Sequence, residues 1–326
     1  MKLKILCAAL LVQTFALPLT AHAEDWTAYT YSSVSTTAAV KGMNRIAERV
    51  EEETDGDLTM TLHLGKTLQI ASSDITQATG DGIVDFAADF FFSGTVPIAR
   101  ILNLPMLIEN DEQWDKAYAA IEPTLVDAFA EQNVVLLGGY RYPEQTIFTT
   151  FPVNSLADLK GHKVRVTSPD QGKFIEEFGG APITLSGSEV PTSLERGVIE
   201  GVLTASAGGA KNWHEFLPYN YRFPVNYGNS MIIANTDAFD ALPEETQATL
   251  SKIVAEEGPA ITENFRKDEK VQMASQSEAG MTITEASASE IEMATGKLSP
   301  YWEAWAEENG PEYVEALKVV RDAIGK

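Results

Sequence analysis

The sequence has little cysteine, few basic side chains and few long apolar runs. Its 326 residues include one cysteine and four histidines, and 24 lysines and arginines stand against 47 aspartates and glutamates. The resulting net charge of −23 argues against a nucleic-acid partner and repels anionic membrane surfaces. With 44% hydrophobic and 22% charged residues, the chain still has the composition of a globular protein, and its length predicts about two domains.

The longest apolar run of the sequence lies at the N-terminus. Lys2 and Lys4 precede an almost wholly apolar stretch over residues 5–19, and Ala21-His22-Ala23 places small residues at the −3 and −1 positions of a cleavage site. A short basic start, an apolar run of this length and a small-residue site together predict a secretory signal peptide over residues 1–23.

Cleavage after this segment would give a mature chain that begins at Glu24. Because Cys7 lies inside the segment, the mature chain would contain no cysteine, and its net charge would be −25. An exported chain of this size without disulfides indicates the periplasm of a Gram-negative bacterium. No later run approaches the ~20 apolar residues of a membrane span, so we expect no direct membrane insertion.

Strand-like runs alternate with helical patterns along the mature chain, which predicts an α/β fold. Apolar residues at helical spacing predict a helix over residues 37–54, and residues 58–64 alternate apolar with polar side chains, as a strand does. The run Val134–Leu137 is fully apolar and favours a short parallel strand that is buried on both faces. The other elements predicted in this half are strands over residues 26–31 and 84–88 and a helix around residues 114–125.

A second α/β series begins after Pro152. Strands are predicted over residues 163–166, 183–185 and 198–203, and helices over residues 171–178 and 189–196. A long helical pattern then runs from Pro243 to about Ser277, where Gly258-Pro259 predicts a kink because proline lacks the amide donor. One final amphipathic helix is predicted to carry the aromatic and apolar residues between Tyr301 and Val320.

The sequence shows no recognisable catalytic or metal-binding constellation. His63, His162 and His214 are widely spaced and have no cysteine partners in the mature chain, which argues against a zinc site. Gly65-Lys66-Thr67 resembles the end of a phosphate-binding loop, but that loop's first glycine is replaced by Met60. We therefore predict no catalytic residue, no metal and no cofactor.

The stretch from Pro152 to Phe216 carries the most specific pattern. It contains Asp158-Leu159-Lys160-Gly161 followed by a strand with Lys163 and Arg165, then Gly180-Ala181-Pro182, then Glu189 ahead of Leu194-Glu195-Arg196-Gly197, and finally Glu200-Gly201. This order of turns resembles the solute-binding proteins of tripartite ATP-independent periplasmic (TRAP) transporters. The resemblance extends over essentially the whole mature chain, although Glu200 stands where the family usually has aspartate.

The resemblance implies an α/β, two-lobed periplasmic binding protein fold with a hinge and a long helix that crosses the lobes. Lobe I would comprise residues 24–142 plus about 230–270, and lobe II residues 143–229 plus about 271–326. The lobes would close around a small anionic organic solute. The aromatic residues Phe90–Phe92, Tyr31 and Trp213 further predict that this solute is a monocarboxylate, a keto acid or an aromatic acid, and not a highly hydroxylated sugar acid. The bound solute would then be delivered to the TRAP membrane permease subunits.

Arg165 is the principal candidate ligand-binding residue. The resemblance implies that the arginine of this strand pairs with the ligand carboxylate. The residues themselves agree, because an arginine between Val164 and Val166 would be awkward in a core and its planar fork matches a carboxylate. The alternative is an ordinary edge-strand arginine that pairs with a protein carboxylate.

Further candidates lie near the ends of predicted strands, where ligands of α/β proteins bind. Gln145 aligns near a second ligand-contacting arginine of the family's sialic-acid branch, and Arg141 is a candidate to supply the missing charge or an ordinary surface residue. Thr204 takes the place of a ligand-contacting asparagine. The remaining candidates are Tyr31, Asp89, Phe90 from the run Phe90–Phe92, and Trp213, which fits the core equally well.

Two other functions remain open from the sequence. One is an exported α/β enzyme that acts on a carboxylate, although no nucleophile with an oriented base is recognisable. The other is a ligand-binding subunit that hands the same solute to a sensor kinase in place of a permease.

Overall fold

The computed structural model describes residues 23–326, so the predicted signal peptide lies, apart from Ala23, outside the described residues. The first half of the chain forms the expected α/β series. Thr37 caps α1 because its side chain accepts a hydrogen bond from the Val40 amide at 3.2 Å. The elements of this half are β1 (Glu24–Thr30), α1 (Ala38–Glu53), β2 (Leu58–His63), α2 (Ile75–Gly80), β3 (Phe86–Asp89), the 3₁₀ segment η3 (Pro97–Asn103) and α3 (Asp111–Ala130).

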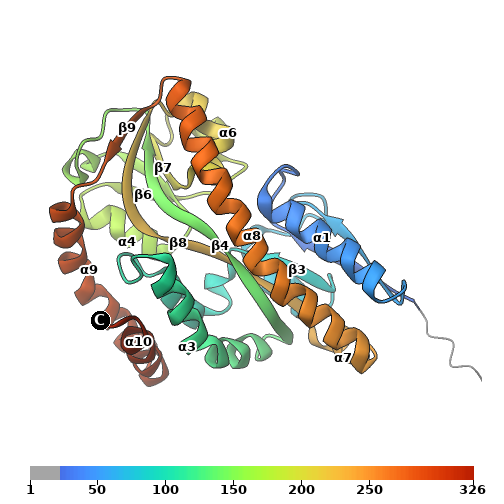
Figure 1. The fold of residues 1–326 in the computed structure, drawn as a ribbon. Coiled ribbons are helices and arrows are strands. Elements are labelled where there is room, and N and C mark those ends of the chain that lie inside the picture. The colour runs from blue at the N-terminus through green and yellow to red at the C-terminus, as the bar shows by residue number, and fades with distance from the viewer. Residues whose placement is uncertain (1–22) are drawn as a thin grey trace, which may run out of the picture.

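Two long antiparallel strands run side by side through the centre of the molecule (Figure 1). They are β4 (Val134–Thr149) and β8 (Tyr219–Asn235). The short parallel strand expected at Val134–Leu137 is therefore wrong, because this segment is the start of β4, pairs antiparallel with β8 and leaves Leu136 and Leu137 only half-buried.

All strands belong to one hydrogen-bonded sheet in the order β2-β1-β3-β8-β4-β7-β5-β6, with β9 (Thr282–Glu285) also paired to β8. The first-half strands β1 to β3 join one end of the β4–β8 pair, and the second-half strands join the other end. Between the two ends the β4–β8 register shifts at Arg141/Glu144 and again at Gln145/Ile147. The assignment of residues to lobes I and II stays a prediction.

The second α/β series matches its predicted elements closely. It comprises β5 (Lys163–Val166), α4 (Pro169–Glu177), β6 (Ala181–Thr184), α5 (Val190–Glu195) and β7 (Gly201–Thr204). A π-type turn, η5 (Ser206–Ala210), and the short helix α6 (Lys211–Trp213) follow β7.

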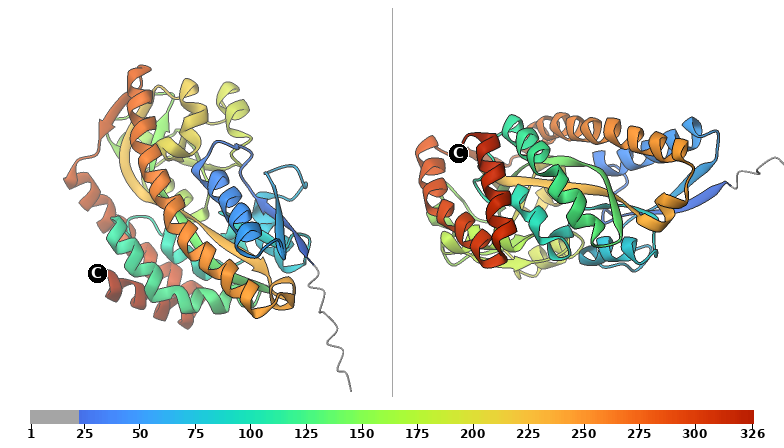
Figure 2. Two further views of the ribbon diagram at one scale, coloured as in Figure 1. Left: turned by 45° about the vertical axis from the view of Figure 1, so that its right-hand side comes forward. Right: turned by 90° about the horizontal axis from the view of Figure 1, so that it is seen from below.

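The long helix α8 (Glu244–Glu278) follows α7 (Thr236–Ala241) and lies across both halves of the sheet (Figure 2). It continues through Gly258 and Pro259. The single final helix predicted from the sequence is wrong: Gly310, at φ 128°, and Pro311 divide it into α9 (Ala288–Asn309) and α10 (Pro311–Ile324).

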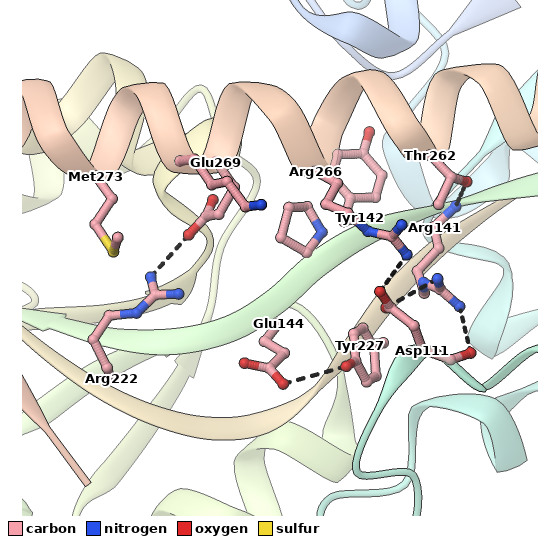
Figure 3. A pocket seen from close by; sticks show the side chains of 12 residues that line it. Asp111, Arg141, Tyr142, Glu144, Arg222, Tyr227, Thr262, Arg266, Glu269 and Met273 are labelled. Carbon is pink, nitrogen blue, oxygen red and sulfur yellow. Dashed lines mark hydrogen bonds and ion pairs between the residues drawn. The ribbon is translucent and has the colours of Figure 1, made fainter. Parts of the chain in front are cut away.

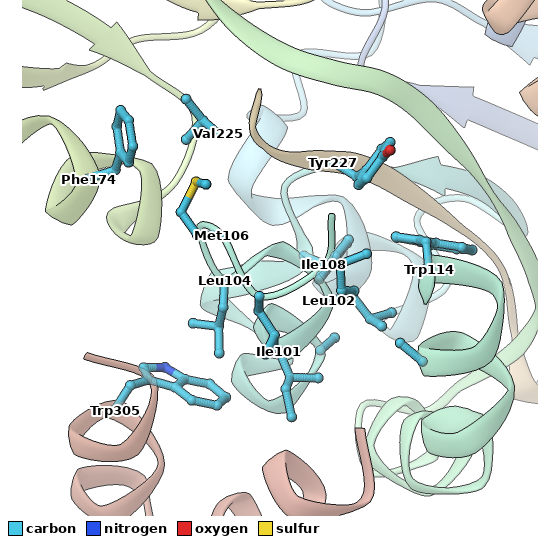
Figure 4. Close-up of a cluster of buried hydrophobic side chains, with 14 of the residues drawn as sticks. Ile101, Leu102, Leu104, Met106, Ile108, Trp114, Phe174, Val225, Tyr227 and Trp305 are labelled. Atoms are coloured by element: carbon cyan, nitrogen blue, oxygen red, sulfur yellow. The ribbon is translucent and has the colours of Figure 1, made fainter. Parts of the chain in front are cut away.

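The largest group of buried apolar side chains combines residues from both α/β series (Figure 4). Ile101 and Leu102 come from η3, Phe174 from α4, and Trp305 from α9. The C-terminal helices are therefore part of the core, where α10 packs beside α3 (Figure 1) and α9 packs against α10 and α4. None of the helices within residues 23–326 has the length and apolarity needed to cross a membrane.

Candidate ligand-binding cleft

A cleft of about 720 Å³ opens between the two halves of the molecule. Its walls are the segments that follow β1, β2 and β3 on one side and those that follow β5, β6 and β7 on the other, with the middle of β4 between them. Strand ends from both series thus meet at one opening, which is where α/β folds bind ligands.

Arg165 lies on β5, and the alternation of that strand sends its side chain into the cleft. Val164 and Val166 belong to the core, so Arg165 between them points to the opposite face. The strand is not an edge strand, since it pairs with β6 on one side and β7 on the other. The alternative of an edge-strand arginine is therefore wrong for this residue.

The Arg165 guanidinium is buried without a counter-charge. The residue is 4% exposed, its Nε donates to the Leu185 carbonyl at 2.9 Å, and its guanidinium lies 5.6 Å from the centre of the Trp213 ring. No carboxylate within residues 23–326 comes within the 4.0 Å of an ion pair with it. Burial lowers the pKa of Arg165 to about 10, which leaves it cationic at neutral pH. A buried cation of this kind is a preformed site for an anion.

Four aromatic rings form a continuous wall on the first-half side of the cleft. The Phe90 ring centre lies 5.5 Å from that of Tyr31 and 5.2 Å from those of Phe91 and Tyr142. The Tyr31 and Tyr142 hydroxyls are hydrogen-bonded to each other, and burial raises the pKa of both phenols. Phe92 is a core residue instead, so two of the three consecutive phenylalanines line the cleft.

Three other candidates also line the cleft. The Gln145 side chain lies on β4 and donates to the Pro143 carbonyl at 2.9 Å. Thr204, at the end of β7, accepts a hydrogen bond from the Gly209 amide at 2.9 Å. Trp213 both lines the cleft and packs in a small core cluster, so it is a lining residue and a core residue at once.

Arg141 does not line this cleft. It faces a separate pocket of about 260 Å³ beneath α8, where it forms an ion pair with Asp111 at 2.9 Å (Figure 3). A second ion pair joins it to Asp115 at 3.0 Å. Its guanidinium also lies 4.8 Å from the centre of the Trp114 ring. We call this the rear pocket. Because both aspartates already neutralise Arg141, the structure gives it the role of a partner in structural ion pairs, and not the ligand contact expected from the sequence.

Asp89 is fully buried and likewise does not line the cleft. Its carboxylate accepts hydrogen bonds from the amide and hydroxyl of Thr76, at 3.1 and 2.6 Å, and from the Phe91 amide at 2.6 Å. Burial raises the pKa of Asp89 to about 6 in spite of these donors. Asp89 therefore acts on the cleft only indirectly, by fixing the backbone next to Phe90 and Phe91.

Several lining residues were not predicted. Lys66 stands at the cleft after β2, in the segment that resembled a phosphate loop, and the strand-end rule applied to Tyr31 could have found it. The serine-rich segments at Ser72–Ser73 and Ser186–Ser188 also line the cleft. Phe265 comes from the middle of α8, and no local pattern singles it out. Within residues 23–326 no cluster of metal-ligating side chains is present.

The comparison with known families decides what kind of protein carries this cleft. A model of the bacterial extracellular solute-binding proteins, family 7 (DctP), matches residues 30–309. The chain belongs to this family. A solute-binding protein of Sulfitobacter sp. (strain NAS-14.1) is 25% identical over 255 residues, or 76% of this chain and 77% of that protein. A solute-binding protein of Chromohalobacter salexigens is 30% identical over 189 residues, or 56% of this chain and 55% of that protein.

Solved structures of solute receptors share the fold. An extracytoplasmic solute receptor of Bordetella pertussis, DctP7, that binds pyroglutamic acid superposes with a TM-score of 0.86 at 23% identity, covering 93% of this chain and 100% of the receptor. A TRAP periplasmic solute-binding protein of Desulfovibrio salexigens with bound orotic acid gives 0.86 at 18% identity, covering 92% and 98%. The TRAP resemblance and the two-lobed binding-protein fold are confirmed. The family is one of solute receptors and not of enzymes.

Proposed function

We propose that this family 7 protein captures a small organic acid with a single carboxylate in the periplasm by closing its two lobes. It then delivers the acid to the membrane permease of a TRAP transporter. The observation that carries the proposal is the Arg165 guanidinium, which is buried in the cleft beside Trp213 and has no carboxylate partner among the described residues. A ligand carboxylate would supply the missing counter-charge through two parallel hydrogen bonds.

The number of cations at the cleft supports a monoanion. Besides Arg165, the one other lysine or arginine that lines it within residues 23–326 is Lys66, which is exposed. A second buried carboxylate on the ligand would thus have no buried cation to pair with, and desolvating it would be costly.

The aromatic wall supports a compact or flat body for the acid. Tyr31, Phe90, Phe91 and Tyr142 offer ring surfaces against which an apolar or planar group gains by burial and stacking. The serine hydroxyls that line the cleft, at Ser72–Ser73 on the same side and at Ser186–Ser188 on the opposite side, can bind one or two polar substituents. Structural neighbours bind acids of both kinds, pyroglutamate and orotate on the one hand and glucuronate and galacturonate on the other. The cleft of this protein favours the first kind.

A thermal-shift screen of the purified mature protein tests this proposal. Pyroglutamate, orotate, benzoate and short 2-oxo acids are compared with glucuronate, galacturonate and a sialic acid. A bound acid at 100 times its dissociation constant should stabilise the protein by about 2.7 kcal/mol. Stabilisation by the sugar acids alone would contradict the expected ligand class. A co-purified acid that is returned chemically unchanged would further separate a receptor from an enzyme.

Export and delivery need their own measurements. N-terminal sequencing of the protein recovered from the periplasm should begin at Glu24, and a retained Met1 would contradict export by cleavage. Uptake of the identified acid by cells should depend on both this protein and the permease. If a transcriptional response to the acid depends on this protein and uptake of the acid does not, the sensor-kinase alternative is favoured.

A further inference from the structure

The turn Ser206–Ala210, which follows β7 in the chain, lies between the cleft and helix α8. Ala207, Gly208 and Gly209 all line the cleft. Gly208 has non-helical dihedral angles, φ −86° and ψ −125°, inside the turn. The geometry of this turn therefore shapes the surface that a solute meets.

Two candidate ligand-binding side chains depend directly on the turn. The Gly209 amide donates to the Thr204 hydroxyl at 2.9 Å. Gly209 also lies so close to Trp213 that an added Cβ would come within 2.0 Å of the indole ring, so the ring rests directly on the turn. Because the Trp213 ring in turn lies under the Arg165 guanidinium, a displacement of the turn would be passed to the cation that binds the carboxylate.

The turn is held from behind by a buried carboxylate of α8. One oxygen of Glu269 accepts a hydrogen bond from the Ala207 amide at 2.7 Å, and the other pairs with Arg222 at 2.8 Å. Gln276, one further side chain of α8, donates to the Ser206 carbonyl at 3.2 Å. Glu269 itself lines the rear pocket and not the cleft, so it acts on the solute through the turn.

We propose that Glu269 is a positioning residue for solute binding. One of its carboxylate oxygens holds the turn Ser206–Ala210 against α8 through the Ala207 amide, while the other pairs with Arg222. The turn then sets the positions of Thr204, Trp213 and Arg165. Arg222 orients the carboxylate from the rear pocket through their ion pair at 2.8 Å. The proposal rests on the proposed function in taking Arg165 as the site of the solute carboxylate.

The Glu269→Gln variant tests this role with little change in shape. A carboxylate accepts hydrogen bonds on both oxygens, whereas an amide accepts on one and donates from the other, so glutamine cannot satisfy both Ala207 and Arg222. Glu257→Gln is a matched control on the same helix. The Glu257 side chain is also 10% exposed and is also paired on both oxygens, to Arg45 at 2.9 Å and Arg49 at 3.2 Å, but it touches neither the turn nor the cleft.

Hydrogen–deuterium exchange on the full mature chain reads the position of the turn without any ligand. We expect the amides of residues 204–213 to exchange about tenfold faster in Glu269→Gln than in wild type, and unchanged in Glu257→Gln. Equal exchange of this segment in the two variants would overturn the proposal. If Glu269→Gln does not fold, Glu269→Asp takes its place, because it keeps both acceptors but withdraws them from Ala207.

A binding measurement with pyroglutamate as the probe completes the test. If pyroglutamate binds the wild type, its affinity should fall about tenfold in Glu269→Gln and stay within about twofold in Glu257→Gln. An unchanged affinity in Glu269→Gln would overturn the proposal. If pyroglutamate binds none of the three proteins, the exchange result decides, which keeps failure of the positioning role distinct from failure of the expected ligand class.

Discussion

At the scale of single residues, the three charged candidates predicted from the sequence are all buried, but with unequal numbers of partners. Asp89 has three hydrogen-bond donors, Arg141 has two aspartates, and Arg165 has one backbone carbonyl. Desolvation penalises each charge, so the one with the fewest partners gains the most from a bound counter-ion. This difference in the number of partners singles out Arg165. The sequence alone could not show the difference, because all three residues lie in strands or at strand ends and most of their partners come from other segments of the chain.

Replacement of Arg165 by alanine should weaken binding of the identified acid by roughly 2–5 kcal/mol, or about 30-fold to a few thousandfold, because the ligand carboxylate would be buried unpaired. Arg165→Lys keeps the charge but loses the planar fork, so it should also bind measurably worse. Isothermal calorimetry on the folded variants measures both effects. An Arg165→Ala affinity within about threefold of wild type would show that the arginine is structural.

Asp89 should give the stability of the protein a measurable pH dependence. Its pKa is about 6 in the folded protein against an ordinary 3.8, so the folded state binds the proton more tightly. The resulting stabilisation is complete below the unfolded pKa and is lost as the pH rises through about 6. The loss amounts to about 3 kcal/mol.

Urea unfolding of wild type and Asp89→Asn measures this effect. Because asparagine does not titrate, the unfolding free energy of wild type minus that of the variant should fall between about pH 4 and pH 7. A difference that stays constant over this range would show that Asp89 keeps its ordinary affinity for protons in the fold.

At the scale of elements, the amphipathic and the alternating segments are the ones that could be predicted. The helix over residues 37–54 buries one consistent face, and the strand over residues 163–166 alternates core valines with basic side chains. The structure places both within a residue or two of the expected bounds. β8 was missed because Pro224, Gly228 and several asparagines interrupt its apolar pattern. Phe265 was missed for a different reason: its place in the cleft depends on how α8 crosses the sheet, which no local pattern shows.

The packing of α8 on β4 depends on the absence of a side chain at Gly258. A Cβ at this position would come within 2.4 Å of the Gly139 carbonyl oxygen, which the backbone cannot easily avoid. We therefore expect Gly258→Ala to destabilise the protein by about 1–3 kcal/mol.

Gly296, in the middle of α9, is the matched control for this effect. Apart from its chain neighbours and the backbone of its own helix, no atom lies within 4 Å of the place that its Cβ would occupy. Gly296→Ala should thus stabilise the protein by about 0.5–1 kcal/mol through helix propensity alone. Chemical unfolding of both variants checks the pair, and a loss of stability at Gly296 or none at Gly258 would contradict it.

At the scale of the whole molecule, the proposed closure of the cleft depends on the two long strands that its walls share. Its walls belong to segments attached to opposite ends of the β4–β8 pair, and the register shifts near Arg141 and Gln145 lie between those ends. Hinges are commonly a few residues that absorb changes in backbone dihedral angles while the flanking elements stay rigid. We expect the two strands to bend at these shifts when a solute binds.

Small-angle X-ray scattering should show this closure as a smaller radius of gyration at a saturating concentration of the identified acid. The Arg165→Ala protein should need a concentration of acid at least about 30-fold higher to reach the same contraction. A wild-type radius that does not change at saturation would contradict closure, whatever the affinity.

The sharing of β4, β8 and the largest core cluster between the two halves also bears on how the protein unfolds. Leu102 from the first series and Phe174 from the second lie in one cluster, and each half of the sheet depends on the same two strands. Neither half can lose its structure without exposing apolar surface of the other, so unfolding should be cooperative over the whole chain. Scanning calorimetry should then record one heat-absorption peak whose calorimetric and van't Hoff enthalpies agree, and two separable peaks would show that the halves melt independently.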